Sequence, residues 1–280
     1  MAGISTKEIK TRIRSMESTR QITRAMEMVA SAKLRKAQAR ALECRPYFET
    51  FYSVIWDIVN SSESIDSPYL RLKVGNKAAF VLISGDRGLA GGYNSNVMKL
   101  LQAQGEGKEY SVLPIGKKGG DYLKTRGIST LTERYMNGEA TSIGDCFSIA
   151  KQLCKGFLAG ELDAVYVVYT QFQSMLTQKP CCLQLLPLQT DAEKASGKQQ
   201  QIVYEPDSAA VFEAIVPEYL GGVLYGALCE SRASEQAARR TAMDAATQNA
   251  QEMIDGLSLQ YNQARQSAIT QEITEIVAGS

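Results

Sequence analysis

The sequence predicts a fold of the α/β class combined with a long helical coiled coil, in which antiparallel N- and C-terminal helices flank an inserted α/β domain. Three observations predict it: both ends of the chain are poor in helix breakers, the middle alternates strand and helix patterns, and the two ends carry opposite charge. We expect the N-terminal helix over residues 1–60, the α/β domain over 74–205 and the C-terminal helix over 208–280.

The N-terminal stretch has the composition of one long helix. Residues 4–74 contain no glycine, and the first proline is Pro46. Ser5 and Glu8 form a capping-box pattern, which satisfies free backbone N–H groups of a first turn. Apolar residues recur at helical spacing at Ile9, Ile13, Met16, Ile22, Met26 and Val29. We expect Pro46 to kink or interrupt this helix and residues 47–59 to continue it.

A second helical pattern begins after Asp207, the expected N-cap, and runs almost to Ser280. Its small and apolar positions follow coiled-coil spacing, at Met243, Ala246, Ala250, Met253, Leu257, Tyr261, Ala264 and Ala268. A helix over much of 208–278 would be on the order of 100 Å long, whereas a compact domain of this size has a radius of gyration of only roughly 19 Å. We therefore expect a slender projecting rod that needs partners.

The two ends carry complementary charge. Residues 1–45 hold eleven Lys or Arg against four Asp or Glu, which gives a net charge of +7. Residues 208–280 hold four Lys or Arg against nine Asp or Glu, which gives a net charge of −5. Complementary flanking charges help to orient the helices of a coiled coil, so we expect the two ends to pair. The alternative is that both are simply solvated helix faces.

The middle of the chain alternates strands and helices. Apolar runs predict buried strands at residues 78–84, 110–115 and 163–170, with candidate edge strands at 183–188 and 202–204. Helical patterns lie at about residues 94–104, before Gly127 and at 143–158. This alternation predicts a Rossmann-like α/β domain with a largely parallel sheet.

The residue types that most active sites use are scarce. Histidine is absent, which excludes Ser-His-Asp and Cys-His triads and His-ligated metals. The cysteines form no C-x-x-C pair and are expected to be reduced and mostly buried, at Cys44, Cys146, Cys154, Cys181, Cys182 and Cys229. We expect no catalytic, cofactor-binding or metal site. Without an apolar run of roughly 18 to 20 residues or a signal peptide, we expect a cytoplasmic location.

One glycine-rich loop imitates a phosphate-binding loop. Residues 84–94, SGDRGLAGGYN, follow a strand and precede a helix, but they match neither G-x-G-x-x-G nor G-x-x-x-x-G-K-[ST]. The run GKK at 116–118 also lacks the flanking residues of a Walker motif. We expect a tight turn in which Asp86 and Arg87 make structural contacts, with nucleotide binding as the alternative.

Five segments together resemble one family. They occur in the family's order and cover essentially the whole chain, at residues 21–36 (QITRAMEMVASAKLRK), 84–94, 204–207 (YEPD), 234–247 (SEQAARRTAMDAAT) and 261–277 (YNQARQSAITQEITEIV). They closely resemble the gamma subunits of F-type ATP synthases. The chain lacks the regulatory cysteine insertion of chloroplast members, so thiol control of that kind is not expected.

The resemblance implies a function. In that family the helix pair rotates inside a ring of alpha and beta subunits and drives the catalytic sites of beta. The chain would thus be a non-catalytic rotor subunit of a proton-translocating ATP synthase, although the choice between proton and sodium lies in other subunits. Implied partners are three alpha and three beta subunits, the epsilon subunit and the membrane c-ring, with one copy per complex and no nucleic acid. The implied location is the cytoplasmic face of the cell membrane, as a peripheral membrane protein.

The resemblance also implies contact residues. Contacts with beta are expected at Arg24, Met26, Arg239, Arg265, Gln266 and Thr270. The tip held by an apolar bearing would comprise Ile273, Ile276 and Val277, and the contacts with the c-ring and epsilon would include Tyr204 and Glu205. The alternative is that Met26 and the terminal isoleucines only pack helix against helix and that Arg239 is a solvated arginine.

Two other classes of protein remain as alternatives on the residues alone. A nucleotide-dependent α/β enzyme would need the 84–94 loop to bind phosphate. A coiled-coil scaffold would use its basic N-terminal arm on nucleic acid, with strongly salt-dependent binding. The arm has no interleaved aromatic residue before Tyr47, which argues against the scaffold.

Overall fold

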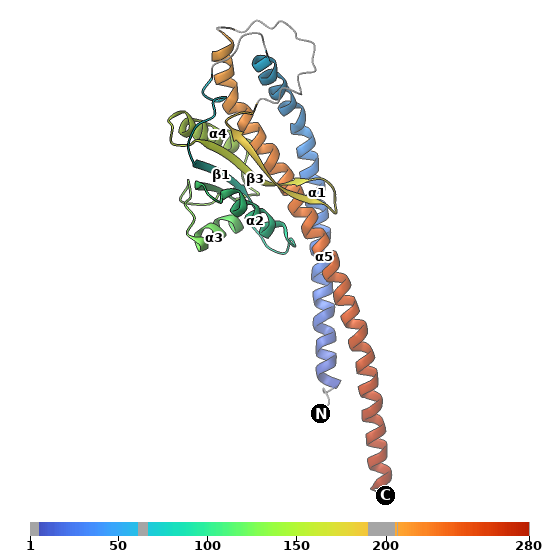
Figure 1. The fold of residues 1–280 in the computed structure, drawn as a ribbon. Coiled ribbons are helices and arrows are strands. Elements are labelled where there is room, and N and C mark those ends of the chain that lie inside the picture. The colour runs from blue at the N-terminus through green and yellow to red at the C-terminus, as the bar shows by residue number, and fades with distance from the viewer. Residues whose placement is uncertain (1–5, 61–66, 190–204, 206, 280) are drawn as a thin grey trace. The chain divides into compact units, whose positions relative to one another are not determined.

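A computed structural model describes residues 6–60, 67–189, 205 and 207–279 of the chain (Figure 1). The described residues divide into two compact units. One unit joins the residues up to Ala32 with those from Arg239 onward, and the other spans Lys33–Ala238. Each unit is presented by itself below.

Two long helices begin and end the described chain. Helix α1 spans Thr6–Asn60, so residues 47–59 continue the helix as expected and Pro46 does not interrupt it. A proline removes only one backbone N–H, and the glycine-free sequence around it favours helix on both sides. Helix α5 spans Ser208–Ala278. Its predicted N-cap is confirmed, because Asp207 Oδ1 accepts a hydrogen bond from the backbone N–H of Ala210 at 2.7 Å.

A four-stranded sheet lies in the Lys33–Ala238 unit. Its strands are β1 (Lys77–Ile83), β2 (Glu109–Ile115), β3 (Ala164–Phe172) and β4 (Gln178–Leu186), in the order β2-β1-β3-β4. Strand β1 is parallel to both β2 and β3, whereas β4 is antiparallel to β3. The predicted, largely parallel sheet is therefore confirmed. The edge strand predicted at 202–204 lies outside the described residues.

Strand β4 begins five residues before the predicted edge strand at 183–188. A tight turn, in which the N–H of Ser174 donates to the carbonyl of Thr177 at 3.0 Å, folds the chain directly back from β3 into β4. The polar start of β4, QKP, carries no apolar alternation from which a strand could be read. Backbone pairing with β3 therefore sets the start of this strand.

Helices cover both faces of the sheet (Figure 1). Helices α2 (Tyr93–Gly105) and α3 (Lys117–Arg126) bury one face, in a core that includes Phe80, Leu82, Val97, Leu101 and Leu123. Helix α4 (Ile143–Leu158) and parts of α1 and α5 from the same unit bury the other, with Val81, Ile83, Leu153, Val167 and Leu224. Every residue of β1 after Lys77 is buried, because both faces of the sheet are covered, and this explains the continuous apolar sequence of the strand.

Helix α5 contains one strongly apolar window. Eighteen of its residues reach a mean hydropathy of 1.2, which by length and composition alone would allow a membrane span, and 44% of the window is buried inside the fold. The buried residues Phe212, Leu220 and Leu228 pack in the core that covers the sheet. Core helices pass the same composition test, so this apolarity is accounted for by packing within the protein.

Candidate functional site

The 84–94 loop is tied together by its own polar side chains. Ser84 Oγ donates to the carbonyl of Ile115 at 3.1 Å and accepts the backbone N–H of Gly119 at 2.8 Å. The side-chain oxygen of Asn94 accepts the backbone N–H of Gly85 at 2.9 Å, and its amide donates to the carbonyl of Arg87 at 3.3 Å. The loop is thereby closed on itself and on the end of β2.

Asp86 fills the place where a phosphate-binding loop would hold its anion. Its carboxylate accepts backbone N–H groups from Lys117 at 3.0 Å, Gly138 at 3.2 Å and Glu139 at 3.1 Å. Lys117 is the first residue of α3, so this carboxylate already satisfies a free N–H at the positive end of that helix. The predicted structural contact of Asp86 is confirmed, and the geometry gives no support to nucleotide binding at this loop.

The unit built from the two chain ends is an antiparallel helix pair. Thr23 and Thr247 share a hydrogen bond between their hydroxyl oxygens at 2.7 Å, and the guanidinium of Arg20 donates to the side-chain oxygen of Gln251. Arg240 lies 3.8 Å from the carboxylate of Glu27. As the chain advances along α1, its partners therefore recede along α5. This is the antiparallel pairing that the charge pattern predicts.

The seam of this pair is narrow and mostly apolar. Its buried residues are Ile9, Thr23 and Ala30 on α1 and Met243, Ala250 and Ile254 on α5. Alanine at central positions lets two helix backbones approach closely. The ion pair between Glu27 and Arg240 is partly exposed, with side-chain exposures of 25% and 40%, so it contributes little compared with the seam.

The predicted contact residues differ in exposure. Arg24 on α1 and Arg265, Gln266 and Thr270 on α5 are exposed, while Met26 is half-buried. Arg239 differs from them, because only 9% of its surface is exposed. It is therefore not a solvated arginine, and the alternative interpretation of this residue is wrong.

The C-terminal end of α5 carries large apolar side chains that are mostly exposed. Ile273, Ile276 and Val277 are 57%, 70% and 72% exposed. At the register set by the pairs above, Thr6 at the start of α1 lies about level with Ala264, and every described residue from 265 to 279 is exposed. These side chains do not pack helix against helix in this structure, contrary to the alternative.

Two further predicted residues precede α5. Tyr204 lies outside the described residues, and Glu205 is exposed. Arg24 and Met26 lie on α1 between Thr23 and Glu27, whose side chains contact α5.

Neither the polar pairs of the helix seam nor the role of Arg232 was predicted from the sequence. The position of Thr23 in the seam could have been found, because Ile9, Met16, Thr23 and Ala30 recur every seven residues, as seam positions of a coiled coil do. No sequence pattern marks Arg232. Its guanidinium binds backbone carbonyls of a distant loop, and backbone acceptors leave no mark in a sequence.

The described cysteines are poorly suited to thiol chemistry. Cys146, Cys154 and Cys229 are buried and free, and Cys181 and Cys182 are half-buried and free. Burial raises the pKa of Cys146 to about 12 and that of Cys154 to about 11, which suppresses the reactive thiolate at neutral pH. The Cys44 side chain lies outside the described residues.

Comparison with known proteins places this arrangement in a family. A family model described as ATP synthase matches residues 5–280. The ATP synthase gamma chain of Ruminococcus albus is 44% identical over 279 residues, which cover 98% of this chain and 97% of the relative. A gamma chain of Acetobacterium woodii, described as sodium ion specific, is 41% identical over 98% of this chain and 97% of its own length.

The fold has solved counterparts. A chain of the mitochondrial ATP synthase of Euglena gracilis, in a structure of the OSCP, F1 and c-ring parts, aligns with a TM-score of 0.68 and 19% identity. The alignment covers 98% of this chain and 93% of that one. Long terminal helices flanking an α/β sheet are therefore an arrangement that this chain shares with a solved structure.

Proposed function

The chain belongs to the gamma-chain family of ATP synthases, and on that premise we propose that it is the central rotor shaft of such an enzyme. The observation that carries the proposal is 44% identity to a gamma chain across nearly the full length of both proteins. The shaft turns within a hexamer of alpha and beta subunits and couples ion flow through the membrane c-ring to ATP synthesis or hydrolysis. It contributes no catalytic group, because that chemistry belongs to beta.

The geometry of the helix pair suits this role. A shaft must turn as one body, and the seam hydrogen bond between Thr23 and Thr247 opposes sliding of one helix along the other. The exposed residues 265–279 leave the end of α5 available to surrounding subunits. Neither feature requires the chain to bind nucleotide.

We assign partner contacts as part of the same proposal. Contacts with beta comprise Arg24, Met26, Arg239, Arg265, Gln266 and Thr270, and the apolar bearing holds Ile273, Ile276 and Val277. Exposure of the last three supports their assignment, since apolar side chains left in water favour burial against another subunit. The contacts with the c-ring and epsilon include Tyr204 and Glu205.

The finer features of the complex belong to the proposal too. One copy of the chain serves three alpha and three beta subunits, with epsilon beside the α/β domain, taken as residues 74–205. The complex sits on the cytoplasmic face of the cell membrane, and protons are the proposed coupling ion. Because one relative is described as sodium ion specific, sealed vesicles containing the whole enzyme should be tested for ATP-driven acidification and for sodium uptake separately.

Assembly tests the central claim directly. The full chain is mixed with the matching alpha and beta subunits, and the complex is isolated and its subunit ratio measured by native mass spectrometry. We expect one copy per hexamer and ATPase activity that exceeds that of alpha and beta alone. Folded components that fail to assemble, or an ATPase rate that the chain does not change, would contradict the proposal.

A further inference from the structure

The turn at residues 137–141 has a rigid internal structure. The side-chain oxygen of Asn137 accepts the backbone N–H groups of Glu139 at 2.9 Å and Ala140 at 3.0 Å. The carbonyl of Asn137 accepts both the N–H and the hydroxyl of Thr141. Directly afterwards, Ser142 caps α4 through a complete capping box. The turn is therefore a preformed unit that other elements can hold without ordering it.

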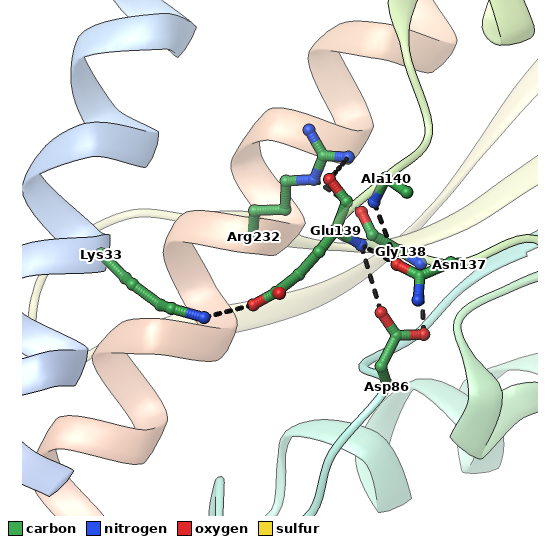
Figure 2. A network of polar contacts seen from close by, with 7 residues as sticks. All are labelled: Lys33, Asp86, Asn137, Gly138, Glu139, Ala140 and Arg232. Carbon is green, nitrogen blue, oxygen red and sulfur yellow. Dashed lines mark hydrogen bonds and ion pairs between the residues drawn. The ribbon is translucent and has the colours of Figure 1, made fainter.

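Two charged side chains hold this turn from different elements (Figure 2). Asp86, at the end of β1, accepts the N–H groups of Gly138 and Glu139. Arg232, on α5, donates from Nε to the carbonyl of Gly138 at 2.7 Å and from Nη2 to the carbonyls of Glu139 at 3.2 Å and Thr141 at 2.8 Å. The turn is thus fixed both to the sheet and to the long helix within the Lys33–Ala238 unit.

Helix α1 reaches the same turn through a weaker contact. Lys33 Nζ lies 2.5 Å from the carboxylate of Glu139. The two side chains are 43% and 53% exposed, and an exposed ion pair of this kind contributes little to stability. The charge-assisted bonds of Arg232 are stronger and better oriented. Arg232 is therefore the main link between the turn and the long helices.

The other contacts between α5 and the sheet in this unit are both polar and apolar. Ser231 Oγ accepts the backbone N–H of Thr170 on β3 at 3.0 Å, and Ser234 Oγ donates to the carbonyl of Thr170 at 3.1 Å. Leu220, Leu224 and Leu228 pack in the core beside β1 and β3. Apolar packing resists separation but has no preferred direction, so it opposes sliding only through shape. A planar guanidinium bound to three carbonyls has a fixed geometry and opposes displacement in several directions. A force acting around the axis of α5 would therefore load the Arg232 bonds together with the two serine bonds to Thr170.

We propose that the 137–141 turn is a joint through which torque passes between the α/β domain and the long helices, with Arg232 as its positioning residue. The inference rests on the proposed rotor function and deepens it. Arg232 touches no partner subunit in this assignment. It holds the α/β domain at a fixed angle to α5 within the Lys33–Ala238 unit, so that rotation of one is transmitted to the other.

Hydrogen exchange of the full-length chain tests the joint without any partner. In Arg232→Ala, we expect the amides of Gly138 and Glu139 to exchange roughly tenfold faster, because the loss of the carbonyl bonds loosens the turn. Arg232→Lys should give an intermediate rate, since lysine supplies charge without the planar fork. Arg134→Ala is the matched control: it removes an exposed arginine from the neighbouring loop that makes none of these bonds.

Single-molecule rotation then tests the transmission of torque. The chain is assembled with alpha and beta, and a bead is attached through Lys99→Cys on the exposed side of α2, with Cys44→Ser, Cys181→Ser and Cys182→Ser to prevent a second attachment. With the hexamer paused, we expect the angular variance of the bead to rise about twofold in Arg232→Ala, because one anchor of the turn is lost. The ATPase rate should stay unchanged.

The outcomes separate the two proposals. Equal variance in Arg232→Ala and Arg134→Ala, with both complexes assembled, would overturn the joint and leave the rotor function standing. Failure of the unsubstituted chain to assemble would overturn the rotor function. If Arg232→Ala does not fold, Arg232→Lys carries the same comparison, and a variance equal to that of the unsubstituted chain would again overturn the joint.

Discussion

Gly116, between β2 and α3, has a backbone conformation that few residues other than glycine adopt. Its φ is 100°, and a Cβ at this position would lie 2.1 Å from the carbonyl oxygen of Ser84. The contacted atom belongs to the backbone, so it cannot move away as the end of a flexible side chain can. We expect Gly116→Ala to lower the free energy of unfolding by about 3 kcal/mol or more, measured by urea denaturation of the full chain.

Gly127 provides a matched comparison for this prediction. It caps α3 with a φ of 66°, and a Cβ there would meet no atom within 4 Å. Gly127→Ala should therefore lower the free energy of unfolding by only about 1 kcal/mol, because a residue with a side chain is strained in the left-handed conformation. Equal losses in the two variants would show that the close approach to Ser84 is not what constrains Gly116.

Glu230 is a half-buried carboxylate whose surroundings favour the neutral form. Burial raises its pKa, an effect only partly offset by a hydrogen bond from the backbone of Phe172. The Glu230 carboxylate in turn helps to raise the pKa of the nearby Tyr169. Oε2 of Glu230 is buried without a hydrogen-bond partner among the described residues. The folded state therefore prefers the protonated acid.

The sign of the pH dependence follows from this preference. Because the folded pKa lies above the unfolded one, the stability that the protonated acid contributes is present below the unfolded pKa and is lost as pH rises through the folded pKa. Glu230→Gln should raise the melting temperature at pH 7 and change it less at pH 4, with a gain at neutral pH below about 1 kcal/mol because solvent screens a half-exposed group. A gain that is larger at pH 4 would contradict this assignment.

Residue-level prediction from the sequence succeeded where the chemistry is local. Asp86 was identifiable because it stands in a loop between a strand and a helix, where a carboxylate finds free N–H groups. Arg232 was not, since its acceptors are carbonyls 91 to 94 positions away along the chain. Such a contact exists only once the tertiary fold has formed.

At the scale of elements, the long helices were the easiest to predict and the edge strand the hardest. Helix α4 was predicted to span 143–158, and it does, because Ser142 and Asp145 form a capping box ahead of an apolar periodic pattern. The first residues of β4 carry no such pattern, and pairing with β3 decides where that strand starts. Local signals therefore predict helix bounds better than strand bounds in this chain.

The register of the helix pair can be tested with a designed disulfide. The hydroxyl oxygens of Thr23 and Thr247 are 2.7 Å apart, so cysteines at both positions would place two sulfur atoms within bonding reach. We expect Thr23→Cys with Thr247→Cys to form this disulfide under mild oxidation, seen as a mobility shift in non-reducing electrophoresis. It should stabilise the helix pair by up to about 4 kcal/mol.

A shifted pair of cysteines is the control for that register. Thr19 lies one helical turn before Thr23, and its hydroxyl donates to the carbonyl of Ser15 in its own helix instead of reaching α5. Thr19→Cys with Thr247→Cys should therefore remain reduced under the same conditions. Cross-linking of this pair in preference to the first would mean that α1 and α5 are displaced by a turn from the register described above.

At the scale of the whole molecule, one helix serves two purposes along its length. Residues of α5 such as Ile254, which is 8% exposed, stabilise the helix pair, whereas Ile273 and Ile276 are 57% and 70% exposed. Burying apolar surface is worth about 25 cal/mol per Å², so burial of the exposed end in the proposed bearing would be favourable. In the proposed shaft, folding and assembly therefore depend on different stretches of the same helix.

Matched charge substitutions separate these two purposes. Ile254→Asp buries an unpaired carboxylate in the helix seam and should destabilise the isolated chain by about 3 kcal/mol or more. Ile273→Asp with Ile276→Asp adds charge only at the exposed end, so the free energy of unfolding of the isolated chain should change by no more than the roughly 0.5 kcal/mol that surface substitutions show.

The same double variant should bind the alpha and beta hexamer more weakly, as measured by the fraction of chain retained on immobilised hexamer. Full retention of that variant would mean that the apolar end of α5 does not lie in a bearing, and the torque-bearing contacts would then have to be sought nearer the seam, around Arg24 and Met26.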